Sequence, residues 1–244
     1  MIKLKEVSKS YGPTVALHTV DLSIHGERTT VLIGPSGCGK STLLRLIIGL
    51  IQPDTGCAAI NGITVSPGIL LQLRQRMGYV IQEGGLFPHL TVRRNVTLMA
   101  LYLGWEKQRI QNRLNELIEL TRFPGDRLDC YPLELSGGQR QRVSLMRALM
   151  LDPDVLLFDE PLAALDPMIR SELQEDLKRI FKTLKKTVVL VTHDLSEAGY
   201  FGDRIVLLKE GRIVQAGTLA ELVRTPAEPF VTRFINAQRS FLEI

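Results

Sequence analysis

The sequence has no apolar run long enough to cross a bilayer. Its longest apolar segments, such as residues 46–51 and 188–191, fall well short of the roughly 20 residues that a membrane-spanning helix needs. Residues 1–7 alternate apolar and charged side chains, so they lack the apolar stretch of a secretory signal. We therefore expect that the chain is not exported and that another subunit spans the membrane if the protein works at one.

Cysteine and excess charge are also scarce. Cys38, Cys57 and Cys130 lie far apart and form no Cys-x-x-Cys or Cys–His pattern, so the sequence predicts neither a zinc site nor a disulfide framework. We expect reduced thiols packed among apolar groups. Lys and Arg outnumber Asp and Glu by 30 to 26, without a basic block, and we expect no nucleic acid partner.

The pattern of apolar residues predicts an α/β protein. Its 244 residues can bury one large core, with or without a smaller one. Helical periodicity follows residue 40, extends over about 88–150, where Val92, Val96 and Met99 share a face, and resumes after Asp166, a good N-cap. Strands are expected at residues 3–7, 15–24, 29–33, 56–65, 155–158, 187–192, 204–208 and 212–215. This alternation favours a largely parallel sheet between helices, with antiparallel hairpins at 3–24 and 56–65.

The first chemical motif is a glycine-rich loop between a predicted strand and a predicted helix. The pattern G-x-x-x-x-G-K-[ST] is formed by Gly34, Pro35, Ser36, Gly37, Cys38, Gly39, Lys40 and Ser41, with Thr42 next. Such loops wrap backbone N–H groups around phosphates at a helix N-terminus. We expect Lys40 to bridge the β- and γ-phosphates, Ser41 to bind Mg²⁺ and Thr42 to lie near the α-phosphate. The alternative is a flexible surface loop.

Two acids follow the apolar residues 155–158. A buried strand that ends in Asp159 and Glu160 delivers both carboxylates to the carboxyl edge of a sheet. Asp159 would hold Mg²⁺ through its water shell, and Glu160 would orient or deprotonate the attacking water of a phosphoryl transfer. Alone, the pair is better explained as a solvated acidic turn; together with the glycine-rich loop, it favours catalysis.

A second glycine pair stands at the start of a helix. Leu135 and Ser136 precede Gly137, Gly138 and Gln139, and Ser136 is a good N-cap. The glycines would expose N–H groups to an anion, although in isolation a capped helix with a flexible lead-in is the better explanation.

In their order along the chain, with residues 135–139 shortly before Asp159 and Glu160, the three motifs resemble the ATP-binding cassette family over nearly the whole chain. The resemblance implies a P-loop NTPase fold with a mixed or largely parallel sheet, an antiparallel β subdomain and an inserted helical subdomain. Residues 1–244 would be one ATP-binding domain, with a core of 1–87 and 151–244 and a helical subdomain of 88–150. It also implies ATP and Mg²⁺ as ligands and ATP hydrolysis as the activity.

The resemblance assigns four further residues. Tyr11 is similar to the aromatic that stacks on adenine, and Gln82 to the glutamine that senses metal and water. Asp166 of Ala164-Leu165-Asp166 is similar to the acid that joins two sites, and His193 to the histidine that contacts the γ-phosphate. Each also has a plain explanation: hairpin packing, a polar strand end, a helix cap and a satisfied polar residue, respectively.

In this family two cassettes enclose ATP, with the glycine-rich loop of one facing residues 136–139 of the other. The expected partners are thus a second ATP-binding subunit, most simply in a homodimer, transmembrane permease subunits and an extracytoplasmic solute-binding protein. The chain would sit peripherally on the cytoplasmic face of the inner membrane. The stretch 81–92 resembles importers of glycine betaine, choline or carnitine. Some of these carry a C-terminal regulatory domain; because 26 residues follow Thr218 here, we do not expect one in this sequence.

Other functions remain open at this point. The cassette could serve another solute, such as an amino acid or lipid, in either direction. Soluble relatives that act on DNA or ribosomes usually have two cassettes or a long coiled-coil insertion, and this chain has neither. A binding module without turnover is opposed by Glu160, which inactive cassettes commonly lose.

Overall fold

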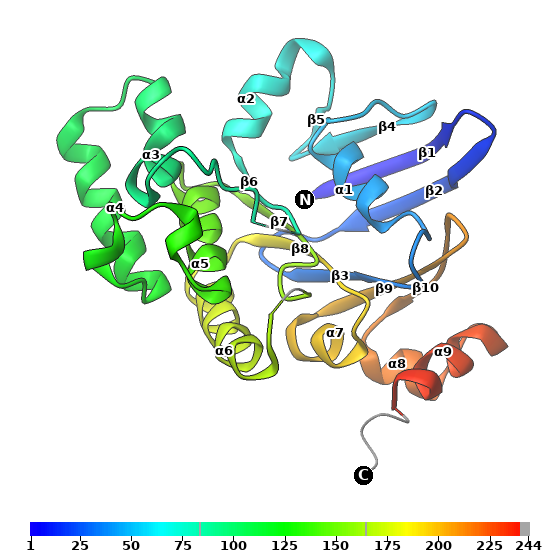
Figure 1. Ribbon diagram of the computed structural model, residues 1–244. Helices are drawn as coiled ribbons and strands as arrows, with labels where there is room; N and C mark the ends of the chain where they lie inside the picture. Colours follow the sequence, from blue (N-terminus) through cyan, green and yellow to red (C-terminus); the bar gives the residue numbers. More distant parts are fainter. Residues whose placement is uncertain (83, 164, 240–244) are drawn as a thin grey trace. The chain divides into compact units, whose positions relative to one another are not determined.

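The computed structural model describes residues 1–82, 84–163 and 165–239, which form two compact units (Figure 1). The first unit joins residues 1–74 to the described residues from Thr187 onward, and the second spans residues 75–186. Two residues that the sequence analysis covers lie outside the described residues: Glu83, in the stretch that resembles betaine importers, and Ala164, in the triplet that ends in Asp166.

The first unit contains an antiparallel sheet of strands β1 (Ile2–Tyr11), β2 (Thr14–Ile24), β4 (Thr55–Ile60) and β5 (Ile63–Thr64). Their order is β2-β1-β4-β5. Along β1, Ile2 and Leu4 are buried and their neighbours Lys3 and Lys5 are exposed, which is the period of two that the sequence displays. Both expected hairpins are confirmed.

The same unit contains a second group of strands, in the order β10 (Arg212–Gly217), β9 (Arg204–Lys209), β3 (Thr29–Ile33), β8 (Thr187–Val191). Strand β3 runs parallel to both β8 and β9, and β10 is antiparallel to β9. Every residue of β3 and β8 is buried, as expected for apolar strands covered on both faces. Helices α7 (Leu195–Phe201), α8 (Leu219–Arg224) and α9 (Pro229–Arg239) complete the unit.

Helix α1 (Lys40–Ile47) is shorter than its apolar pattern predicts. The backbone N–H groups of Gly49 and Leu50 donate to the carbonyls of Leu46 and Arg45, and Gly49 has a φ of 69°. This is a Schellman motif, which ends a helix at a left-handed residue. Helix α2 (Leu70–Gln75) follows β5 after a short 3₁₀ turn.

The second unit pairs two parallel strands, β6 (Met77–Val80) and β7 (Val155–Asp159), with four longer helices. The helices are α3 (Val92–Tyr102), α4 (Lys107–Thr121), α5 (Gly137–Leu149) and α6 (Pro167–Leu184). Helices α3, α4 and α5 lie within residues 88–150, where the sequence predicts helix, but β6 was not predicted. Val92 and Val96 are buried as expected, whereas Met99 is 43% exposed. The α/β fold class expected from the sequence is confirmed.

Buried Asp176 holds three elements of the second unit together. Its carboxylate accepts a hydrogen bond from Arg142 of α5 and one of 3.0 Å from Arg179 of α6, and lies 3.3 Å from Arg122, the C-cap of α4. The Asp176 side chain is 6% exposed and that of Arg142 15%. Removal of one partner of a buried pair leaves the other without a counter-charge.

We expect Asp176→Asn to lower the free energy of unfolding by about 3 kcal/mol, because Arg142 keeps its charge in a buried position. For a chain of this size, the melting temperature should fall by roughly 6–12 °C. Calorimetry measures the change. Glu175→Gln, at an exposed position on the same helix, is the matched control and should stay within about 0.5 kcal/mol of wild type. Equal melting of the two variants would contradict the role of Asp176.

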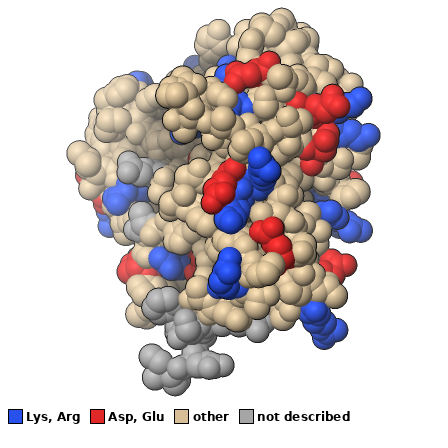
Figure 2. Space-filling model, turned by 90° about the vertical axis from the view of Figure 1, so that its right-hand side faces the viewer, with Lys and Arg blue, Asp and Glu red and all other residues tan. Residues whose placement is uncertain are grey.

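Surface charges of both signs are mixed on the face that Figure 2 displays, where Lys and Arg lie among Asp and Glu. The ion pairs include Lys9–Asp54, at 2.6 Å, and Arg76–Asp154, at 2.5 Å. The chain as a whole carries a small net charge of +4. Within the described ranges, no helix is both long and apolar enough to span a membrane.

Candidate functional site

The glycine-rich loop joins β3 to α1, as the sequence predicts. Gly34, Gly37 and Gly39 have φ values of 152°, 76° and 103°, which L side chains rarely adopt. A Cβ on Gly34 would lie 2.2 Å from the Leu208 carbonyl oxygen, and one on Gly39 2.7 Å from that of Ala16. The backbones of β9 and β2 therefore lie directly against the loop, and only glycine fits at Gly34 and Gly39.

The N-terminus of α1 is suited to an anion. Gly39 is its N-cap, and within this fully described loop no side chain caps the helix and no acidic residue occupies the first turn. By contrast, Thr91, Ser136 and Asp166 cap α3, α5 and α6 through side-chain oxygens. Gly39 therefore offers no side-chain cap to the first N–H groups of α1, which carry the positive end of the helix dipole.

Lys40 extends over the loop from the first position of α1. It is 5% exposed, and its Nζ donates to the carbonyl oxygens of Gly34, at 2.8 Å, and Pro35, at 3.0 Å. Cys38 Sγ lies 3.8 Å from the same nitrogen. Burial raises the pKa of the Cys38 thiol despite the nearby ammonium, so Cys38 is a neutral packing group here. A buried ammonium, uncapped N–H groups and glycine backbone together fit a phosphate chain.

Strand register brings His193 to the same sheet edge as this loop. In the parallel pair β3–β8, Leu32 is level with Val191, and the Thr192 N–H donates to the Leu32 carbonyl at 3.2 Å. Gly34 and His193 each follow the paired residues by two positions, so both lie at the carboxyl edge, where α/β sheets bind ligands. His193 is exposed there.

The second unit builds a similar edge from β6 and β7. Val80 is level with Phe158, so Gln82 and Glu160 both lie two residues beyond the paired strands. Buried Asp159 ends β7 and accepts a hydrogen bond of 3.4 Å from the Tyr79 hydroxyl. The structure thus brings Gln82, Asp159 and Glu160 to one edge. The missed strand β6 is the element that positions Gln82.

Glu160 has a left-handed backbone conformation, with a φ of 48°. Other non-glycine residues with positive φ include Asn61 in a hairpin turn, and Arg122 and Lys185, which cap helix C-termini. Glu160 instead follows a buried strand directly. A strained non-glycine residue is retained where the surroundings over-determine it, and such residues cluster at active sites.

The loop after Gln82 is held by two residues that sequence reasoning missed. Ser144 donates to the Gly84 carbonyl at 2.8 Å, and Arg147 donates to the carbonyls of Gly84 and Gly85 at 2.9 and 2.8 Å. Burial lowers the pKa of the Arg147 guanidinium. Both residues lie on α5, and their spacing gives no local sign of a partner some 60 residues earlier.

Residues 136–139 start α5 with a reciprocal cap. Ser136 Oγ accepts from the Gln139 N–H at 3.2 Å, and the Ser136 N–H donates to Gln139 Oε1 at 3.0 Å. A Cβ on Gly138 would lie 2.6 Å from Ile169 Cγ2, and one on Gly137 3.1 Å from Leu165. Glycine is therefore needed for close packing against the start of α6, where Asp166 accepts from Ile169 N–H at 3.1 Å. The structure places Ser136–Gln139 beside Asp166.

Tyr11 ends β1, at the turn of the hairpin whose second strand contacts Gly39 through Ala16. It is 45% exposed, and Lys9 Nζ lies over its ring, 5.8 Å from the ring centroid. The hairpin thus adjoins the glycine-rich loop within the first unit.

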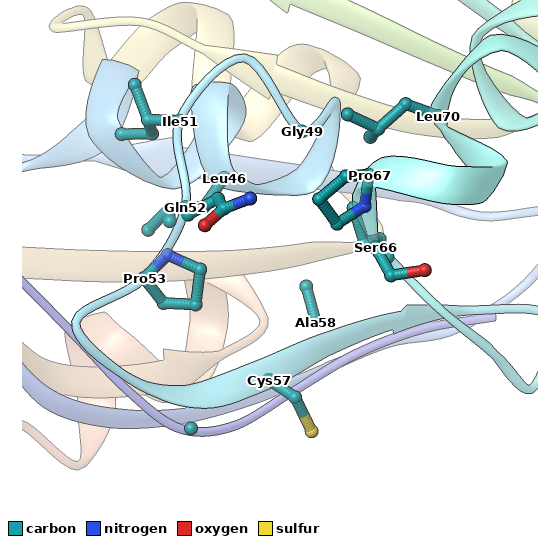
Figure 3. Close-up of a pocket in the computed structure, with 12 residues that line it drawn as sticks. Leu46, Gly49, Ile51, Gln52, Pro53, Cys57, Ala58, Ser66, Pro67 and Leu70 are labelled. Atoms are coloured by element: carbon teal, nitrogen blue, oxygen red, sulfur yellow. The ribbon is translucent and has the colours of Figure 1, made fainter.

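A cavity of about 240 Å³ lies at the other end of α1 (Figure 3). Its lining includes Leu46, Pro67 and Leu70, whereas the Cys57 thiol points away from it. The lining residues, all of them described, carry no charge. This cavity is therefore a poor match for a triphosphate and is distinct from the glycine-rich loop, about 12 Å away along the helix.

Within the described residues, no group of three or more His, Cys, Asp or Glu side chains could hold a metal ion. This is compatible with Mg²⁺ bound through phosphate, since that ion usually takes one or two protein carboxylates, with waters and phosphate oxygens as its other ligands. Asp159 is a carboxylate at the end of β7 in the second unit, and Ser41 is a hydroxyl next to Lys40 in the first unit.

Comparisons with known proteins give the same family that the sequence motifs resemble. The family model described as "ABC transporter" matches residues 17–163. "Glycine betaine/carnitine/choline transport ATP-binding protein OpuCA" of Bacillus subtilis is 46% identical over 240 residues, covering 98% of this chain and 63% of OpuCA. "Osmoprotectant import ATP-binding protein OsmV" of Salmonella typhimurium is 42% identical, covering 98% of this chain and 64% of OsmV. The chain thus spans less than two thirds of these relatives.

A solved structure adds the fold. The dimeric post-hydrolysis state of the ATP-binding cassette MJ0796, bound to ADP and Pi, is 34% identical with a TM-score of 0.81, covering 90% of this chain and 99% of that one. The resemblance and the fold class drawn from the sequence are both confirmed. Because the family model matches more than half of the chain, this protein belongs to the ABC transporter family.

Proposed function

We propose that this chain is the ATP-hydrolysing subunit of a bacterial importer for quaternary amines such as glycine betaine, choline or carnitine. The observation that carries the ATPase part is the loop at residues 34–42, where glycine backbone, an uncapped helix N-terminus and buried Lys40 converge. The solute class is supported by the names of OpuCA and OsmV. An adjacent gene for an exported binding protein with an aromatic box would support it further.

In this proposal the nucleotide is held by residues from the first unit. The N–H groups of the loop surround the phosphates, Lys40 bridges the β- and γ-phosphates, and Thr42 lies near the α-phosphate. Tyr11 stacks on adenine with its exposed ring. The support is that one short segment supplies a charge, a dipole and a close backbone approach.

Hydrolysis uses residues from both sheet edges. Glu160 accepts a proton from the attacking water, Gln82 orients that water, and His193 donates to the γ-phosphate. Ser41, Gln82 and Asp159 would hold Mg²⁺, directly or through water. That ion would neutralise negative charge on the phosphate oxygens. The support is that Gly34 and His193 follow level positions of the β3–β8 pair, and Gln82 and Glu160 follow level positions of the β6–β7 pair.

A second chain completes the site. Residues 136–139 of one copy face the γ-phosphate held by the other, with the positive end of α5 directed at it, and Asp166 links the two sites. Support comes from the close packing of Gly138 on Ile169, which ties the Ser136 cap to the Asp166 loop, and from the dimeric MJ0796 cassette.

Permease subunits would dock beside the loop that follows Gln82. Exposed apolar side chains gather there in the sequence: Phe87 in the loop itself, and Met99, Leu101 and Tyr102 along α3. Tyr102 is 81% exposed. The chain would then lie peripherally on the cytoplasmic face of the inner membrane, with residues 88–150 as the helical subdomain, and a solute-binding protein would act on the outer face.

Phosphate release tests the ATPase proposal. With Mg²⁺ and ATP, the purified chain should release phosphate at a rate that rises with the square of chain concentration while the monomer predominates. EDTA should abolish the release, and excess Mg²⁺ should restore it. No release at any concentration would contradict an ATPase, and a rate proportional to concentration throughout would contradict the shared site.

A further inference from the structure

The side chain of Gln238, on helix α9, forms hydrogen bonds with the backbone on both sides of Asp194. Its Nε2 donates to the His193 carbonyl oxygen at 2.7 Å, and its Oε1 accepts from the Leu195 N–H at 2.6 Å. One side-chain amide thus satisfies an acceptor and a donor of the same short segment, as a neighbouring strand would. The contact spans 45 residues of sequence.

The rest of this segment is fixed by local bonds. Thr192 Oγ1 lies 2.6 Å from Glu197 Oε2, and the Asp194 carboxylate accepts from the N–H groups of Ser196 and Glu197 at the start of α7. These contacts fix Thr192 and the N-terminus of α7. Gln238 contacts the carbonyl oxygen of His193 itself and so helps to fix the peptide plane beside the imidazole.

Helix α9, which carries Gln238, is itself anchored to the first unit by buried side chains and by contacts near its N-terminus. Val231 and Ile235 are buried, and Gln238 follows Ile235 by three residues, on the same helix face. Lys209 Nζ lies 4.9 Å from the Phe230 ring centroid. The chain entering α9 is held by Gln215, which donates to the Thr225 carbonyl and accepts from the Ala227 N–H.

We propose that Gln238 is a positioning residue for ATP hydrolysis: it fixes the backbone that carries His193, so helix α9 sets where the imidazole meets the γ-phosphate. The inference rests on the proposed role of His193. A misplacement of about 1 Å at a reacting group can cost up to 100-fold in rate. Gln238 touches no substrate, so its loss should affect kcat and leave nucleotide binding nearly unchanged.

The test is Gln238→Met, which removes both hydrogen bonds at similar volume. We expect kcat to fall about tenfold, with KM for ATP within about twofold of wild type, and faster hydrogen exchange at residues 193–197. Asn236→Ala, which removes an exposed amide from the same helix, should match wild type in all three. Wild-type kcat and exchange in Gln238→Met would overturn the proposal.

A double-mutant cycle with His193→Ala separates positioning from general destabilisation. If Gln238 acts through His193, the double variant should hydrolyse ATP no more slowly than His193→Ala alone. A further tenfold loss in the double variant would overturn the proposal. If His193→Ala keeps wild-type kcat, the proposed role of His193 fails. In that case, faster exchange in Gln238→Met still supports the backbone contact and unchanged exchange refutes it.

Discussion

Lys40→Ala should weaken ATP binding by about 100-fold, close to 3 kcal/mol, because it removes charge-assisted hydrogen bonds to phosphate in a buried place. Lys40 is 5% exposed and its ammonium donates to the carbonyls of Gly34 and Pro35 in the glycine-rich loop, where salt screens it little. Titration calorimetry with Mg²⁺ and ATP measures the loss. Replacing Ser41 by Ala as well should remove the remaining Mg²⁺-dependent affinity.

Lys5→Ala is the matched control, since Lys5 is an exposed lysine in the same unit. It removes the same charge and should bind ATP like wild type. Lys40 also holds the carbonyls of Gly34 and Pro35, so the melting temperature of Lys40→Ala must be checked alongside. Wild-type affinity in a folded Lys40→Ala and Ser41→Ala double variant would refute the nucleotide site.

Local patterns predicted most of the elements around the site. The β1–β2 and β4–β5 hairpins followed from alternation and from Asn61-Gly62, whose positive φ values the turn requires. Helix α6 followed from the Asp166 cap and Pro167. Strand β6 could not be predicted in this way, because four residues with a glycine form no clear period. A Cβ on Gly78 would lie 2.5 Å from the Ala148 carbonyl, so tertiary packing dictates that glycine.

Site residues were predicted to the extent that they belong to contiguous motifs. Lys40, Asp159, Glu160 and Ser136 each stand in a short pattern with a physical reason. Ser144, Arg147 and Gln238 stand in none, because their roles arise from contacts 43 to 63 residues away in sequence. Met99 was expected to be buried from the helical period, which fixes a face but not what covers it.

Glu160→Gln should lower the rate of ATP hydrolysis by at least about 100-fold while ATP binding persists, because an amide cannot accept the proton of the attacking water. Gln has the same shape, so the left-handed backbone at residue 160 and the hydrogen bond of neighbouring Asp159 to Tyr79 should be retained. Single-turnover phosphate release measures the rate, and titration measures the affinity.

Two outcomes of the same variant separate catalysis from binding. If Glu160 acts after nucleotide capture, ATP should accumulate in the shared site, and Glu160→Gln should form a stable dimer with ATP that wild type forms only transiently. Sedimentation or light scattering detects it. Glu172→Gln, an exposed change on α6, should keep wild-type turnover and give no such dimer. Unchanged phosphate release in Glu160→Gln would mean that another group accepts the proton of the attacking water. The left-handed conformation of Glu160 would then have no role in proton transfer.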